Sequence, residues 1–418
     1  MENLETILDI TMKISNATLM HKNVQRLLKD VKEEFDAVIV EWMHSEVYAG
    51  FSSVYKCPLI WSSPFEPNPF VLMLLNDHSM SRGLSTSTST QQQNFWKRVV
   101  EQYRYLHFTF SRWLLSDKEK SVFNRAFGPA TAKRGGILPP FEVVKYNGSL
   151  VLGNSHFSTG QTFHLSQNYV QIAGYHIEVE RELLPKNLQK IMDGSKKGVV
   201  YFSLGSMLRG YPFSNNIETN LLDIFGKINR TVIWKYTKPL KTPNNVHVFS
   251  NIQHQSVLAH PNCSLFISNG EQLSIIEAIH FGIPYIGIPI AGEKINNVET
   301  VVKRGFGKKV DFLNITSLKA AIDEVLRNSK YRENAKSISS IYHDRPITPG
   351  KELVFWVEHV VRTKGALHLR SSILSPWYDT VYLEFMIVVL IPVACLSVLT
   401  CILVRRKKHE DLSLKKFV

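Results

Sequence analysis

From Gly198 to Pro289 the chain alternates short apolar runs with helical segments, and this alternation restricts the possible folds more than any other feature of the sequence. The apolar runs have the length of strands and are rich in β-branched and aromatic residues: GVVYFSLGS, RTVIWKY, NVHVF, SLFISNG and IPYIGIP. Helices are expected near 214–228, at HQSVLAH and over 273–282. Strands that alternate with helices in this way predict a doubly wound parallel sheet.

Ligands of such sheets bind beyond the carboxyl ends of the strands, so the segments SLGS, ISNG and PIAGE are expected to line one cleft. A turn at the Gly of SLGS would bring backbone N–H groups and the Ser206 hydroxyl to a phosphate. Asn269 and Gly270 stand at the next strand end, and the helix after them directs its N-terminal amides to the same point. An anion is favoured there.

The first half of the chain predicts a second α/β unit. FDAVIVEW and KCPLIWSS are strand-like runs separated by a helical segment, and SLVLGNS and VQIAGY follow later. Residues 79–94 are polar and predict a loop, whereas 96–115 carry apolar residues at helical spacing. That helix is expected to pack against a core or a second domain. An acceptor-pocket or membrane-facing role is the open alternative.

A chain of 418 residues is long for a single core, so two domains are expected. The patterns place an N-terminal domain at 1–182, a polar linker at 183–198 and a C-terminal domain at 199–345. A helical segment follows at 346–384.

The C-terminal end has the pattern of a membrane anchor. FMIVVLIPVACLSVLTCILV, residues 385–404, contains no charge, and a basic tail follows at 405–418. We expect a single transmembrane helix with the tail in the cytosol and the domains before it in the lumen. The last four residues, KKFV, resemble the dilysine signal of endoplasmic-reticulum membrane proteins. The net charge is +13, but the basic residues do not form a stripe interleaved with aromatic residues, so nucleic acid is not an expected partner.

Several segments, in this order, resemble the UDP-glycosyltransferase family, the membrane-bound glucosyl- and glucuronosyltransferases, with an insect-type character in EWMHSEVYAGF. The segments that carry the resemblance are LVLGNSHF, IAGYHIE, VVYFSLGSM, HQSVLAHPNCSLFISNG, EAIHFGIPYIGIPI, IYHDRPITP and ELVFWVEHVVRTKGALHLR. The resemblance implies a GT-B-like fold, in which two Rossmann-type doubly wound domains face a cleft. It also implies that the N-terminal domain selects a small lipophilic acceptor and that the C-terminal domain binds a UDP-sugar as co-substrate, with no separate cofactor and no metal.

The same resemblance assigns roles residue by residue. Ser206 matches a phosphate-contacting Ser and Glu277 a ribose-binding Glu, whereas Asn269 stands for a His that contacts the diphosphate. Glu271 replaces a Gly and brings a carboxylate toward phosphates that repel it. Asn251 stands where the family has a Trp that stacks on uracil, and His254 where it has a Gln that bonds the edge of uracil. Glu293 and Lys294 replace the Asp–Gln pair that holds the sugar. The expected donor-binding set is Ser206, Asn251, His254, Asn269, Gly270, Ser274, Glu277, Glu293 and Lys294.

The catalytic machinery implied by the resemblance is a His base held by an Asp. Glu41 occupies the position of that Asp, while the segment that should carry the His would precede Met1. His21 is the alternative, although its amphipathic surroundings favour a structural role. The first thirty residues also lack the apolar core of a signal peptide, so the sequence is expected to be incomplete at its N-terminus.

The resemblance thus implies an inverting transfer of a hexosyl group, glucose in the first instance, from a UDP-sugar to a hydroxyl of a small lipophilic acceptor. Because the base is missing, transfer by this 418-residue chain is expected to be impaired. The changes at Asn251, Asn269, Glu271 and Lys294 leave open a second function, a non-catalytic partner that pairs with active transferase chains in the membrane. A third possible function is that of a lumenal protein that binds carbohydrate without UDP.

Overall fold

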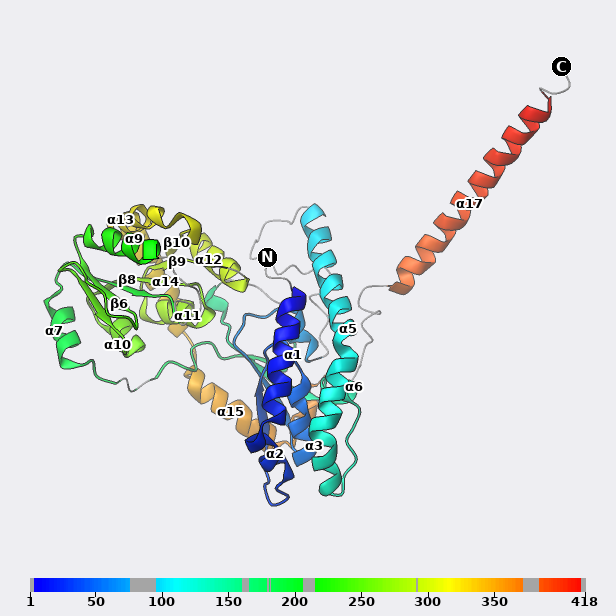
Figure 1. Cartoon of the computed structure of the whole chain (residues 1–418), viewed down its shortest axis with the longest axis horizontal. Coiled ribbons are helices and arrows are strands. Elements are labelled where there is room, and N and C mark those ends of the chain that lie inside the picture. The colour runs from blue at the N-terminus through cyan, green and yellow to red at the C-terminus, as the bar shows by residue number, and fades with distance from the viewer. Residues whose placement is uncertain are drawn as a thin grey trace.

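The computed structural model contains two parallel β-sheets, each covered by helices and each belonging to a different half of the chain (Figure 1). It describes residues 4–75, 95–159, 165–178, 180, 182–205, 215–290, 292–370 and 383–414. The polar tract predicted as a loop at 79–94 and the candidate Ser206 lie outside these residues.

The first sheet consists of four parallel strands in the order β1-β2-β3-β4. Its strands are β1 (Val38–Glu41), β2 (Leu59–Ser63), β3 (Gly148–Gly153) and β4 (Tyr169–Gln171). These described strands run in sequence order and show no reversal of winding, and the parallel sheet expected for the first domain is confirmed. Apolar runs fix the strand positions but carry no information on where a sheet changes direction.

Helices of the N-terminal half cover one face of this sheet. They are α1 (Leu4–Met20), α2 (Lys22–Lys29), α3 (Gly50–Tyr55), the long α5 (Phe95–Lys133) and the short α4 (Pro69–Met73) and α6 (Phe141–Val144). Leu28, Phe123 and Phe127 pack there against Trp61 and Val151. The alternation of side chains along β2 and β3 sends Ile60 and Leu150 to the opposite face.

That opposite face is covered by α15 (Pro349–Arg362), a helix from the far end of the sequence. Val360 is fully buried in a cluster with Ile60, Leu150 and Ile172, and Trp356 packs against its edge. Figure 1 shows α15 passing from the second half of the molecule back to the first. The two halves are therefore joined by packing as well as by the chain between them.

The second sheet has six parallel strands in the order β10-β9-β8-β5-β6-β7. They are β5 (Val199–Ser203), β6 (Thr231–Lys235), β7 (Val246–Phe249), β8 (Cys263–Ser268), β9 (Tyr285–Gly287) and β10 (Gly307–Lys309). Counted within the domain this is 3-2-1-4-5-6, the order of a doubly wound nucleotide-binding sheet. The predicted fold of the second half is confirmed, and the winding reverses between β5 and β8.

Helices cover both faces of the second sheet. The helices are α7 (Lys186–Gly194), α9 (Asn215–Gly226), α10 (His254–Ala259), α11 (Gln272–Phe281), α12 (Glu293–Lys303), α13 (Leu318–Arg327) and α14 (Ser329–His343). Side chains alternate along β5, so Tyr201 joins the core under α11 and α14, while Phe202 joins the core under α9 and α13. The segment 183–198, expected as a polar linker, contains α7, and its Leu188 is fully buried in the core under α11.

The C-terminal run expected to cross a membrane forms part of α17 (Leu383–Leu414), a helix of 32 residues with Pro392 inside it. Within the described part of the chain, no helix meets both the length and the apolarity required of a membrane span.

Candidate functional site

The carboxyl ends of β5 and β8 meet where the second sheet reverses, and each strand is followed by a glycine with positive φ. Gly205 has φ +64° and Gly270 has φ +85°, a region that side-chain-bearing residues rarely adopt. Ser203 and Ser268 are paired in the strand register, which brings the two turns side by side. The crevice beside such a reversal is the usual ligand site of this sheet type.

The turn after β8 is closed by its own side chains. Asn269 is buried, and its Nδ2 donates to Leu204 O at 3.3 Å and to Glu271 Oε1 at 2.8 Å. Its Oδ1 accepts the Glu271 N–H at 3.2 Å. Lys294 Nζ, from the first turn of α12, reaches the same Glu271 oxygen at 3.1 Å. Asn269, Glu271 and Lys294, three candidates from the sequence, thus form one hydrogen-bonded group at the end of the strand.

Gly270 is required by close packing as well as by its φ. A Cβ there would lie 2.7 Å from Val298 Cγ2 and 2.9 Å from the backbone oxygen of Lys294. Its N–H donates to Tyr285 Oη at 3.0 Å, and its carbonyl accepts from Asn297 Nδ2 at 3.1 Å. These contacts fix the turn against β9 and α12.

Glu277 lies in the middle of α11 and is buried. Its Oε2 lies 2.8 Å from His254 Nε2, and Tyr201 Oη lies 2.9 Å from His254 Nδ1. His176, from the segment after β4 in the first domain, places its Nε2 3.7 Å from Glu277 Oε1. The structure therefore joins two predicted donor residues, His254 and Glu277, and adds His176, which sequence reasoning missed.

The two imidazoles keep the buried carboxylate ionised. Burial alone would raise the pKa of Glu277, but His176 and His254 outweigh that effect and hold the pKa at about 2. An ionised carboxylate is the form that accepts hydrogen bonds from the hydroxyls of a ribose.

The remaining described donor-binding candidates are more exposed than Asn269 and Glu277. Asn251 is exposed in the loop between β7 and α10, Ser274 is partly buried in the first turn of α11, and Glu293 is the exposed first residue of α12. Glu41, the candidate for the residue that orients the base, is exposed at the end of β1. His21 caps α2, and its Nδ1 accepts the Asn23 N–H at 3.3 Å.

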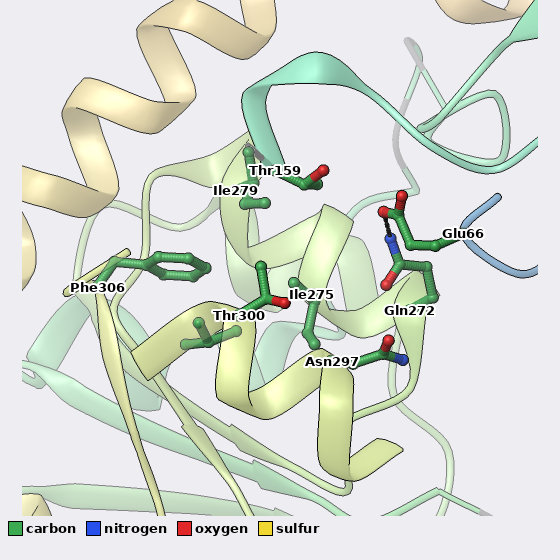
Figure 2. A pocket seen from close by; sticks show the side chains of 9 residues that line it. Glu66, Thr159, Gln272, Ile275, Ile279, Asn297, Thr300 and Phe306 are labelled. Carbon is green, nitrogen blue, oxygen red and sulfur yellow. Dashed lines mark hydrogen bonds between the residues drawn. The ribbon is translucent and has the colours of Figure 1, made fainter. Parts of the chain in front are cut away.

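Glu66 is a second residue that sequence reasoning missed. It follows β2 in the first domain and accepts a hydrogen bond from Gln272 Nε2 at the start of α11 (Figure 2). Burial raises the pKa of Glu66 to about 8, against the opposing effect of the Gln272 hydrogen bond. The signal in the sequence was its place just past a strand end, in SSPFEPNPF, the same criterion that selected ISNG.

Beside this contact lies a cavity of about 10 Å³, which is room for about one water molecule. Figure 2 shows the side chains that line it from both domains: Glu66 and Thr159 from the first, and Gln272, Ile275, Asn297 and Thr300 from the second. Arg304 Nε also donates across the seam to Thr159 O at 3.0 Å. The two domains therefore meet directly at the N-terminal end of α11.

Comparisons with known proteins agree with this architecture. The family described as "UDP-glucoronosyl and UDP-glucosyl transferase" matches residues 73–413. UDP-glucosyltransferase 2 of Dactylopius coccus is 28% identical over 397 residues, which cover 92% of this chain and 76% of that protein. UDP-glucuronosyltransferase 2B15 of Rattus norvegicus is 32% identical over 295 residues, covering 69% of this chain and 54% of that protein.

Among solved structures, the glycosyltransferase VinC in complex with dTDP superposes with a TM-score of 0.54 at 14% identity, over 86% of this chain and 82% of that one. This likeness shows a GT-B-like fold. Together with the family match, which covers most of the sequence, it identifies the chain as a member of the UDP-glucoronosyl and UDP-glucosyl transferase family and hence as a UDP-glycosyltransferase.

Proposed function

We propose that the protein transfers a glucosyl group from UDP-glucose to a hydroxyl of a small lipophilic acceptor, with inversion at the anomeric carbon. The observation that carries the proposal is the buried carboxylate of Glu277, which lies 2.8 Å from His254 Nε2 on a helix of a doubly wound sheet. The choice of glucose rests on likeness to relatives such as the UDP-glucosyltransferase 2 of Dactylopius coccus.

In this proposal the N-terminal end of α11 and the Gly205 and Gly270 turns receive the diphosphate, because the positive end of the helix dipole favours an anion. Glu277 holds the ribose hydroxyls, and Asn251, His254 and Ser274 lie toward the nucleoside side. Ser206, Glu293 and Lys294 complete the donor set, and Glu41 is proposed to orient the base that takes the acceptor proton. The acceptor enters from the first domain.

We also propose that the protein is anchored in the endoplasmic-reticulum membrane by the apolar part of α17, with the two domains in the lumen and the basic tail in the cytosol. Support comes from the uncharged run 385–404, the four cations directly after it and the KKFV end. The described apolar side chains of α17 are exposed in the isolated chain, as lipid-facing side chains would be: Leu390, Ile391, Val393, Leu396, Val398, Leu399, Ile402, Leu403 and Val404.

The test is a transfer assay with the full chain in detergent or vesicles, using UDP-glucose, UDP-glucuronic acid and UDP-N-acetylglucosamine in parallel against a panel of phenols and aliphatic alcohols. The proposal predicts a β-glucoside product, identified by mass and by the anomeric coupling constant in NMR. Glu277→Ala should abolish donor binding. Product from another UDP-sugar alone would overturn the choice of glucose, and an α-linked product would overturn the inverting mechanism.

A second function is favoured by one observation: two of the acidic residues in the site are already engaged, Glu271 by Lys294 and Glu277 by His254. A non-catalytic chain that pairs with active transferases would need neither UDP binding nor turnover. Isothermal titration with UDP separates the two functions, because a donor domain should bind UDP and be stabilised by it, whereas a purely structural partner should show neither effect.

A further inference from the structure

The carboxylate of Glu271 lies over the turn that should hold the donor's phosphates. A Cβ placed at Gly205 would stand 3.8 Å from Glu271 Oε2 and 3.6 Å from Asn269 Nδ2. The backbone of Glu271 therefore lies in the turn after β8, and its side chain reaches the turn after β5. The space between the two positive-φ glycines contains an anionic group of the protein itself.

The polar groups around that carboxylate are those that an incoming phosphate would need. Asn269 Nδ2 and Lys294 Nζ both bond Glu271 Oε1, at 2.8 and 3.1 Å. The Gly270 N–H is already engaged by Tyr285 Oη, and the Glu271 N–H by Asn269 Oδ1. A diphosphate can reach Asn269 Nδ2 and Lys294 Nζ only if the Glu271 side chain moves away.

We propose that Glu271 determines the donor affinity of this site by acting as an internal competitor for the diphosphate. The proposal rests on the function proposed above, because it assumes that the diphosphate binds between the Gly205 and Gly270 turns. Two carboxylate oxygens occupy the position of phosphate oxygens, and their negative charge opposes a second anion. The donor must break the Glu271–Lys294 ion pair before it binds.

Lys294 should raise the affinity for the donor, whereas Glu271 should lower it. Its side chain is 21% exposed and that of Glu271 is 40% exposed, so the pair is partly screened by solvent and can open. While the pair is closed, Lys294 neutralises Glu271. Once a diphosphate displaces the carboxylate, the Lys294 ammonium is available to the phosphate. Removal of Lys294 should therefore weaken donor binding, and removal of the Glu271 charge should strengthen it.

The experiment measures the Kd of UDP for the full chain by isothermal titration at constant ionic strength, for the unmodified protein and for Glu271→Gln, Glu271→Gly and Lys294→Gln. Glu299→Gln is the matched control, since Glu299 lies on α12, pairs with Lys309 at 3.2 Å and stands outside the site. We expect Glu271→Gln to lower Kd about tenfold and Glu271→Gly to lower it at least as far. Lys294→Gln should raise Kd, and Glu299→Gln should leave it unchanged.

The double variant Glu271→Gln/Lys294→Gln tests whether the two side chains act on donor binding together. If they do, its fold-change in Kd should differ from the product of the fold-changes of the two single variants. If the unmodified chain binds UDP and the Glu271 variants bind with the same Kd, the competitor role is overturned while the proposed function stands. If neither the unmodified chain nor either Glu271 variant binds UDP, both are overturned. A thermal melt of each apo variant verifies that the site has not been lost through unfolding.

Discussion

His254 Nε2 lies 2.8 Å from Glu277 Oε2, and this contact joins the first residue of α10 to the buried middle of α11 beneath the reversal of the second sheet. Tyr201 completes the connection from β5 through the other ring nitrogen of His254. Three elements of the domain are thus held together by one row of polar groups. We propose that the same carboxylate accepts hydrogen bonds from the ribose of the donor, which would give Glu277 a part in both fold stability and donor binding.

Stability in acid should depend on Glu277. Its folded pKa of about 2 is below the usual 4.5, so its ionised form contributes stability that is complete above pH 4.5 and is lost as the pH falls toward 2. That contribution is on the order of 3 kcal/mol at neutral pH. Urea unfolding of the unmodified chain and of Glu277→Gln at pH 6 and pH 3.5 measures it. The variant should be less stable at pH 6, and the difference should shrink at pH 3.5; an equal difference at both values would refute the role of ionisation.

The contact between Glu66 and Gln272 should show the opposite pH dependence. Burial raises the pKa of Glu66 from 4.5 to about 8, so the contribution of its neutral form is complete below pH 4.5 and is lost as the pH rises through 8. Glu66→Gln keeps a neutral side chain that bonds Gln272. Between pH 5 and pH 9 the unmodified chain should lose more stability than the variant, as followed by the midpoint of thermal unfolding. Parallel pH profiles would show that Glu66 is ionised in the folded protein.

Gly270→Ala should damage the donor site directly. The added methyl would meet Val298 and the Lys294 carbonyl, and the residue would have to keep φ +85°. A positive φ at Ala costs about 1–2 kcal/mol before the steric overlap is counted. We expect a lower melting temperature and loss of UDP binding. Gly128→Ala is the control: Gly128 lies within α5 and an added Cβ has no neighbour within 4 Å, so stability should be unchanged or rise by up to about 1 kcal/mol.

A buried charge cluster in the first domain gives a prediction independent of function. Arg112 pairs with Glu46, lies 3.2 Å from Glu119 and donates to the His44 carbonyl at 2.7 Å. Arg112→Ala leaves two buried carboxylates without their cation and should lower the free energy of unfolding by about 3–5 kcal/mol.

The exposed pair of Arg362 and Glu358 on α15, at 2.9 Å, provides the comparison for Arg112. Arg362→Ala should cost less than about 1 kcal/mol, because an exposed pair is screened by water. Guanidinium unfolding monitored by tryptophan fluorescence gives both values. Equal costs for the two variants would mean that the Arg112 cluster is hydrated in solution.

The strands of the second domain could be read from the sequence because they are buried on both faces. The runs around Val199, Val232 and Phe266 are continuous apolar segments with few other interpretations. The edge strand β10, Gly307–Lys309, has the sequence GKK and no apolar run, so it gives no such signal. Its place is set by backbone pairing with Tyr285–Gly287.

The site was predictable only where it depends on local backbone geometry. Gly270 and Asn269 follow a strand directly, and their role in the turn follows from that position. His176 and Glu66 reach α11 from the other domain, at distances along the chain that no local pattern encodes. The pairing of Glu271 with Lys294 depends on how α12 starts relative to β8, which the sequence of either segment alone leaves open.

The return of α15 to the first sheet has a consequence for biosynthesis. Ile60, Leu150 and Ile172 leave the ribosome long before Val360, the residue that buries them. At usual elongation rates the stretch from Ile172 to Val360 takes roughly 10–40 s to make. Throughout that interval one face of the nascent first sheet is an exposed apolar surface. The first domain therefore reaches its final form only after the second has been synthesised.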